Sequence, residues 1–152
     1  MEQRFETLKK KFSLPTLKEL ETMFEVSIKD DHLVLQSIRN ETASKLYEIS
    51  KTLEAMVFTH EGSDPEILYE FEMIKDDLKE CYNLYKELNH LYFKALRLKH
   101  EHSKEKDVEY IKDLIKKWPS IESRLKAIFG KIENGWKNFE FSPNNLPETY
   151  HG

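Results

Sequence analysis

The feature that most constrains the fold of this chain is a line of apolar residues from Ile67 to Ala95, along which the spacing alternates between four and three residues. Such spacing places every member on one side of an α-helix, and its persistence over four heptads is typical of helices that pack along their length. The pattern predicts one helix over residues 65–99, with Pro65 in its first turn and Asp64 as its cap. The line consists of Ile67, Phe71, Ile74, Leu78, Cys81, Tyr85, Leu88, Tyr92 and Ala95, and it is widened by Leu68, Leu84, Leu91 and Leu96.

A second long helix is predicted from Asp30 or Asp31, either of which suits the cap position, to about Phe58. Its apolar positions again follow steps of three and four residues. The stretch from His60 to Asp64 ends this helix because glycine, serine and aspartate favour turns. The apolar positions are Leu35, Ile38, Thr42, Leu46, Ile49, Leu53 and Met56.

The last helical pattern runs from near Lys106 to Phe139 and contains Pro119. A proline inside a helix removes one backbone hydrogen bond and crowds the preceding turn. The apolar positions nevertheless keep their phase across Pro119, which favours one helix kinked there. Two separate helices, the second beginning near Ser120, are the alternative. The apolar positions are Val108, Ile111, Ile115, Trp118, Ile121, Leu125, Ile128, Ile132, Trp136 and Phe139.

The N-terminal residues predict a pair of short helices. Residues 2–12 are weakly amphipathic, and Thr16–Glu19 has the form of a capping box at the start of a helix over residues 17–25. Residues 141–152 are rich in Pro and Asn and predict an irregular tail. We therefore predict an all-α fold in a single domain over residues 1–140, an antiparallel bundle of three long helices with the short N-terminal pair.

Composition narrows the class of protein. Charged residues make up 34% and aromatic residues 12%, values that exclude a membrane-embedded chain and a disordered one. The segment from Met1 to Phe12 has no apolar run typical of a signal peptide, so we expect a cytoplasmic protein without membrane partners. Abundant Lys and Glu with scarce Gln are a bias of thermophilic proteins, although an AT-rich genome also favours Lys.

Few patterns in the chain indicate catalysis. It has no Gly-x-Ser-x-Gly elbow and no glycine-rich phosphate loop, and Cys81 lies on the apolar line, which suits a buried side chain. Glu87 with His90, and Glu148 with His151, have the Glu-x-x-His spacing of di-metal proteins, but chance alone produces such matches. The sequence therefore favours a non-enzymatic protein without a metal or cofactor.

One pair of residues provides an enzymatic alternative. Arg97 is followed by four residues and then His102, a spacing that resembles the Arg–His motif of the HEPN ribonucleases, which are small helical bundles. The resemblance implies that Arg97 and His102 line a dimer interface and cleave RNA. The family prefers a polar residue after its Arg, where this chain has Leu98.

Basic side chains gather in the last predicted helix, whereas residues 41–80 are strongly acidic. One interpretation is that acidic and basic helices lie side by side, which would define the topology of the bundle. The other is that the basic residues form a face that binds a phosphate backbone or an acidic partner. The candidate binding residues are Lys112, Lys116, Lys117, Arg124, Lys126 and Lys131.

Three hypotheses for the function follow. The first is a non-enzymatic interaction or assembly protein whose long helices bind partner helices or a second copy, because the apolar face of residues 65–99 is broader than one neighbour requires. The second is a nucleic-acid-associated protein that uses the basic last helix. The third is a HEPN-like ribonuclease. We rank them in this order.

Overall fold

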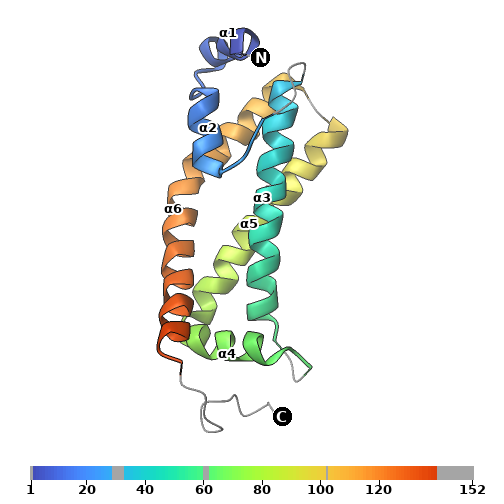
Figure 1. The fold of residues 1–152 in the computed structure, drawn as a ribbon. Helices are drawn as coiled ribbons and strands as arrows, with labels where there is room; N and C mark the ends of the chain where they lie inside the picture. Colours follow the sequence, from blue (N-terminus) through green and yellow to red (C-terminus); the bar gives the residue numbers. More distant parts are fainter. Residues whose placement is uncertain (1, 29–32, 60–61, 102, 140–152) are drawn as a thin grey trace. The chain divides into compact units, whose positions relative to one another are not determined.

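The computed structural model describes residues 2–28, 33–59, 62–101 and 103–139 (Figure 1). Within these ranges it contains six α-helices, one short 3-10 helix and no strand, which confirms the all-α prediction. The elements are α1 (Glu2–Phe12), α2 (Leu17–Phe24), α3 (Val34–Val57), α4 (Pro65–Ile74), η1 (Lys75–Asp77), α5 (Leu78–Glu101) and α6 (Lys104–Lys137).

The contacts of the chain group into two compact units. Unit 1 comprises Met1–Glu48 and Leu88–Trp118, and unit 2 comprises Ile49–Glu87 and Pro119–Gly152. Each of the long helices α3, α5 and α6 is continuous along the chain and contributes one segment to each unit.

Unit 1 packs α1 and α2 with segments of the three long helices. The segments of α3 and α5 run antiparallel, because Arg39 contacts Leu98 while Tyr47, two turns later in α3, contacts Tyr92, earlier in α5. This alternation of direction agrees with the predicted antiparallel bundle. The core of unit 1 includes Phe5, Leu20, Phe24, Ile38, Leu46, Leu91, Leu98, Ile111, Leu114 and Trp118.

The capping box that the sequence predicts is present at the start of α2. The Thr16 hydroxyl accepts a hydrogen bond from the Glu19 backbone N–H at 3.1 Å, and the Glu19 carboxylate accepts one from the Thr16 backbone N–H at 2.8 Å. These bonds satisfy amide groups that a helix start leaves without partners. Leu20 and Phe24 are buried, and the ring of Phe24 lies 5.0 Å from that of Trp118, so α2 is anchored to α6.

Unit 2 packs α4 and η1 with the remaining segments of the long helices. Figure 1 shows α4 running across the start of α5 rather than along the same direction. Ion pairs of Arg124 with Glu87 and of Lys131 with Asp77 show that the segment from η1 into α5 runs antiparallel to α6 here. The core of unit 2 includes Leu53, Met56, Val57, Leu68, Ile74, Cys81, Leu84, Ile121, Leu125, Ile128 and Ile132.

The prediction of one uninterrupted helix over residues 65–99 is wrong. Ile74 has φ −113° and ψ 1°, outside the α-helical region, and Lys75–Asp77 form the 3-10 helix η1. The change of direction there allows both Leu68 and Ile74 of α4 to be buried in unit 2. A short 3-10 turn disturbs the apolar spacing little, so the sequence pattern continues across the interruption.

The buried face of α5 also differs from the predicted line. Cys81, Leu88 and Ala95 are buried as expected. The helix is rotated relative to the prediction because it packs against both α3 and α6, and its most buried face is centred between these two neighbours. Three residues of the apolar line, Leu78, Tyr85 and Tyr92, are only half-buried. Leu84, Leu91 and Leu98, which do not belong to the line, are fully buried instead.

Predictions for the two other long helices differ in outcome. α6 continues through Pro119, so the single helix is confirmed and the two-helix alternative is wrong. α3 begins at Val34, later than predicted, and the proposed caps Asp30 and Asp31 lie outside the described residues, as does the predicted tail, residues 141–152.

Candidate interaction surface

Of the predicted ribonuclease pair, only Arg97 has a described position, because His102 lies outside the described residues. Arg97 is exposed on the last turn of α5, and its Nη1 donates to Oε2 of Glu101 at 2.9 Å. A pairing of this kind, four residues apart on one helix, is an ordinary stabilising contact of a helix surface.

In unit 1, the three basic candidates are Lys112, Lys116 and Lys117. The ammonium of Lys117 lies 3.2 Å from the carboxylate of Asp113. Burial opposes ionisation of Asp113, but the hydrogen bond and charge of Lys117, together with Lys94, outweigh it and lower the pKa of this carboxyl. Lys112 and Lys116 are exposed, and no ion pair joins either of them to another described residue.

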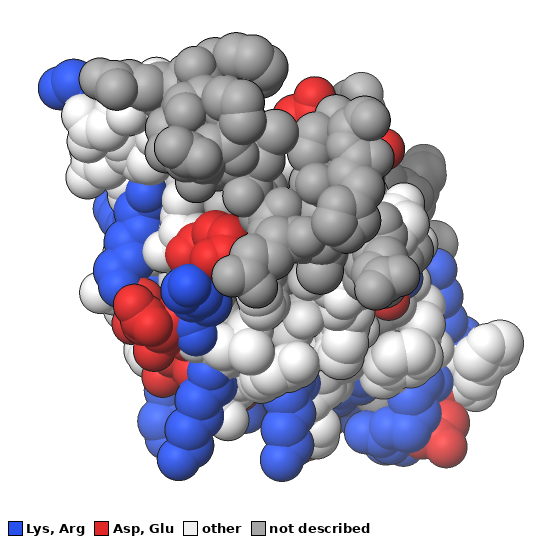
Figure 2. All heavy atoms as spheres, turned by 90° about the horizontal axis from the view of Figure 1, so that it is seen from below, with Lys and Arg blue, Asp and Glu red and all other residues white. Residues whose placement is uncertain are grey.

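In unit 2, all three basic candidates have carboxylate partners. The pairs are Arg124 with Glu80 and Glu87 of α5, Lys131 with Asp77 of η1, and Lys126 with Glu122 of α6. The hydrogen bond to Asp77 is the main cause that raises the pKa of Lys131. Figure 2, which views the molecule from the side where α4 lies, shows several Lys and Arg side chains beside Asp or Glu on the described part of this face.

The Glu-x-x-His spacings do not mark a metal site in the described part of the chain. Glu87 pairs with Arg124, and His90 is exposed two positions after the buried Leu88. No group of three or more His, Cys, Asp or Glu side chains among the described residues is arranged to hold a metal ion. Glu148 and His151 lie outside those residues.

Cys81 is buried in unit 2, as its place on the apolar line predicts. Burial is the main cause that raises the pKa of its thiol, and the negative charges of Asp77 and Glu80 raise it further. A thiol with a raised pKa and little access to solvent is a poor nucleophile.

A buried polar cluster in unit 1 has no counterpart in the sequence analysis. Nη1 of Arg39 lies 2.5 Å from Oδ1 of Asp107, and each side chain is 3% exposed. On the next turn the hydroxyl oxygens of Thr42 and Tyr110 are 3.1 Å apart, and burial raises the pKa of Tyr110 to about 12. Charged residues ordinarily lie at the surface, so no local signal marks Arg39 or Asp107 as buried.

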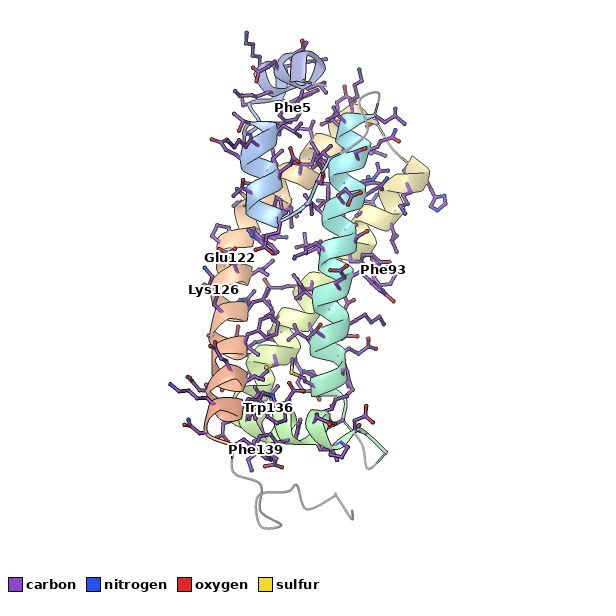
Figure 3. All side chains as sticks on the ribbon, in the orientation of Figure 1. Phe5, Phe93, Glu122, Lys126, Trp136 and Phe139 are labelled. Atoms are coloured by element: carbon purple, nitrogen blue, oxygen red, sulfur yellow. The ribbon has the colours of Figure 1, made fainter. Side chains whose placement is uncertain are left out.

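Three aromatic side chains in unit 1, two of them exposed and one half-buried, form a small surface on α3 and α5. Phe93 is 62% exposed, the largest fraction among the large hydrophobic residues described, and Figure 3 shows it projecting away from the helices. Its ring centre lies 5.4 Å from that of Tyr92, which in turn lies 5.2 Å from that of Tyr47. We call Tyr47, Tyr92 and Phe93 the aromatic surface.

A groove of about 390 Å³ lies between α3 and α5 at the aromatic surface. Its volume is in the range of protein pockets, which span roughly 300–1,000 Å³. Small residues occupy the middle of its α3 wall, and a charged residue stands toward each end. The groove is lined by Asn40, Ala43, Ser44, Tyr47 and Glu48 from α3, and by Tyr92, Leu96 and Lys99 from α5.

Unit 2 carries a second set of partly exposed aromatic residues. Trp136, which the sequence pattern places in the core, is 38% exposed instead. Its ring lies 5.1 Å from Tyr69 of α4 and 5.5 Å from Phe139, and its indole Nε1 donates to Glu70 at 3.5 Å. Figure 3 shows Trp136 and Phe139 close together at the end of α6. Tyr69, Trp136 and Phe139 therefore form a cluster in which each ring contacts the other two.

Comparisons with known protein families, with curated proteins and with solved structures found no significant match to this chain. None of the described helices combines the length and the apolar character that crossing a membrane requires. Any functional conclusion therefore depends on the surface of the molecule itself.

Proposed function

We propose that this protein is a non-enzymatic helical interaction protein and that the aromatic surface is its binding site. The observation that carries the proposal is the exposure of Phe93, 62%, at the end of a row of contacting rings that continues through Tyr92 to Tyr47. A single exposed apolar residue is ordinary, but clustered exposed rings are typical of binding sites. Aromatic side chains are also enriched at the centres of protein interfaces.

The groove beside the aromatic surface supports a helical partner. Its walls are two helices, and Leu96 and the two tyrosine rings provide apolar contacts while Glu48 and Lys99 provide polar ones. An amphipathic helix binds such a groove through apolar residues three and four positions apart, with its polar side in water.

The nucleic-acid hypothesis has weaker support than the interaction hypothesis, because most of the candidate basic residues are already paired. Lys117, Arg124, Lys126 and Lys131 already have carboxylate partners. A phosphate would have to compete with these ion pairs, which leaves Lys112 and Lys116 as the exposed candidates without such a partner among the described residues.

A photocrosslinking experiment tests the proposal. Benzoylphenylalanine replaces Phe93 in the full chain in its source cells, and in a control it replaces Lys116, which is also exposed. Illumination should produce a covalent protein adduct of defined mass from position 93 and none from position 116. Absence of an adduct at position 93, or equal adducts at both positions, would contradict the proposal.

A further inference from the structure

We propose that the partner bound in the groove of unit 1 is an amphipathic helix whose two polar sides differ in charge, with its basic side toward α3 and its acidic side toward α5. This inference rests on the proposed function, since it describes the chemistry of the partner at the same site. It follows from the charges that the two walls of the groove carry.

The α3 wall of the groove is acidic. Glu48 lines the groove, and Glu41 lies seven residues earlier, about two turns, so both point to the same side of the helix. No ion pair joins Glu41 to another described residue, whereas Glu48 already has an interaction within the chain. The exposed residues of α3 in unit 1 include no basic one: they are Asn40, Glu41, Ser44, Tyr47 and Glu48.

The α5 wall is basic. Lys99 lines the groove and is exposed, and no ion pair joins it to another described residue. Glu101 is the one acidic residue among the exposed positions of α5 in unit 1, and its carboxylate accepts from Arg97 at 2.9 Å. The positive charge of Lys99 is therefore available to a partner. The exposed residues of this segment are His90, Phe93, Arg97, Lys99, His100 and Glu101.

The difference in charge runs across the groove, from one wall to the other. The rings of Tyr47 and Tyr92, 5.2 Å apart, define one level that the two antiparallel helices share. Glu41 lies six residues before Tyr47 on α3, and Lys99 lies seven residues after Tyr92 on α5. Because each residue advances a helix by the same rise, Glu41 and Lys99 stand at nearly the same level, one on each wall.

These walls favour a particular kind of helix. A bound amphipathic helix places its apolar residues on the groove, here against Ala43 and Leu96, and the polar residues beside its apolar stripe then face the two walls. Flanking charges of this kind determine partner choice and orientation in coiled coils. A helix that is acidic on both sides would be repelled by α3, and one that is basic on both sides would be repelled by α5.

The same difference also determines the direction of the bound helix. Turning a helix end for end in the groove exchanges the sides that face α3 and α5. A partner with one acidic and one basic side therefore meets opposite charges on both walls in only one direction.

Three synthetic helical peptides with the same apolar stripe test this inference. The mixed peptide has Glu on one side of the stripe and Lys on the other, and two uniform peptides have Glu on both sides or Lys on both sides. The purified full chain should bind the mixed peptide at least about fivefold more tightly than either uniform peptide, because each uniform peptide meets one wall of like charge. Fluorescence anisotropy of labelled peptides at physiological salt measures the three dissociation constants.

Charge reversal on each wall should change the preference in opposite ways. Glu41→Lys makes the α3 wall less acidic, so it should improve binding of the Glu peptide relative to the mixed peptide by about fivefold. Lys99→Glu should improve binding of the Lys peptide relative to the mixed peptide by a similar factor. Lys116→Glu, at an exposed position of α6, is the matched control and should leave the ranking unchanged. Circular dichroism checks that each variant is folded.

The outcomes separate this inference from the proposed function. It is overturned if none of the peptides binds, if a uniform peptide binds as tightly as the mixed one, or if Glu41→Lys and Lys99→Glu leave the ranking unchanged. An adduct from position 93 in cells would then still support the interaction site, and only the chemistry assigned to its partner would be wrong. Preference for the mixed peptide without any adduct in cells would support the charge selectivity of the groove and contradict the proposed function.

Discussion

Arg39 and Asp107 form a buried ion pair that joins α3 to α6 in unit 1, with Nη1 2.5 Å from Oδ1 and each side chain 3% exposed. The same guanidinium group lies 3.5 Å from the carbonyl oxygen of Leu98 on α5, so one side chain contacts two other helices. Removing two charges from water costs free energy, which their mutual attraction offsets only while both remain in place.

Asp107→Ala should therefore lower the free energy of unfolding by about 3–5 kcal/mol, because it leaves the Arg39 charge buried without a partner. The double variant Arg39→Met with Asp107→Ala should lose clearly less than the sum of the losses of Arg39→Met and Asp107→Ala alone. Urea denaturation at neutral pH measures these three variants. Additive losses would show that the two residues do not act as a pair.

Tyr110 should make the stability sensitive to high pH. Burial raises its pKa to about 12 from the ordinary tyrosine value of 10.0, so the folded state resists ionisation that the unfolded chain allows. This stabilisation is complete below pH 10 and is lost as the pH rises toward 12, and two pKa units correspond to roughly 3 kcal/mol. The unfolding free energy should fall less steeply over this range in Tyr110→Phe. Parallel slopes for the two proteins would mean that Tyr110 is not the responsible group.

The position of the buried face on α5 predicts different effects for two leucines on one helix. Leu88 is 0% exposed, so Leu88→Ala should cost about 2–5 kcal/mol. Leu78 is half-buried, and Leu78→Ala should cost about half as much or less. Glu87→Ala, which removes a surface ion pair with Arg124, should cost about 1 kcal/mol at most. Chemical denaturation measures the free energy of unfolding of the three variants. A larger loss for Leu78→Ala than for Leu88→Ala would show that a different face of α5 is buried.

Replacing each of two glycines within α6 with alanine should have opposite effects on the stability of the protein. Apart from its chain neighbours and the backbone of its own helix, no atom of the described residues lies within 4 Å of where a Cβ of residue 130 would stand, so Gly130→Ala should stabilise the protein by about 0.5–1 kcal/mol through helix propensity. A Cβ at Gly135 would clash with the side chain of Met73, so Gly135→Ala should give no gain or a loss. Thermal unfolding measures both, and adding Met73→Ala to Gly135→Ala should recover part of the helix gain.

The basic residues of α6 should contribute to the stability of the protein rather than to binding of nucleic acid. Arg124→Glu breaks contacts with Glu80 and Glu87 and should cost about 1–2 kcal/mol, whereas Lys116→Glu should cost less than about 0.5 kcal/mol. Fluorescence titration with single- and double-stranded DNA and RNA should show no binding tighter than micromolar at about 150 mM salt. Nanomolar, salt-sensitive binding that both substitutions weaken would support the nucleic-acid hypothesis instead.

Much of the candidate site could not be predicted from the sequence. Tyr92 lies on the apolar line, and its neighbour Phe93 lies beside that line, but the pattern alone assigns Tyr92 to the core. The structure leaves Tyr92 half-buried and Phe93 exposed because the rotation of α5 brings Leu91 inward. The groove is formed by residues of both α3 and α5, so the pattern of one segment of the sequence cannot predict it.

The sequence by itself determined the helices, because apolar periodicity, capping residues and turn residues act between close neighbours in the chain. The capping box at Thr16 and the continuation of α6 through Pro119 are of this kind. Only the tertiary structure decided the interruption after Ile74, the buried face of α5 and the pairing of Arg39 with a carboxylate 68 residues away. These features depend on what each helix packs against, and the free energy of burial is set by those distant neighbours rather than by local spacing.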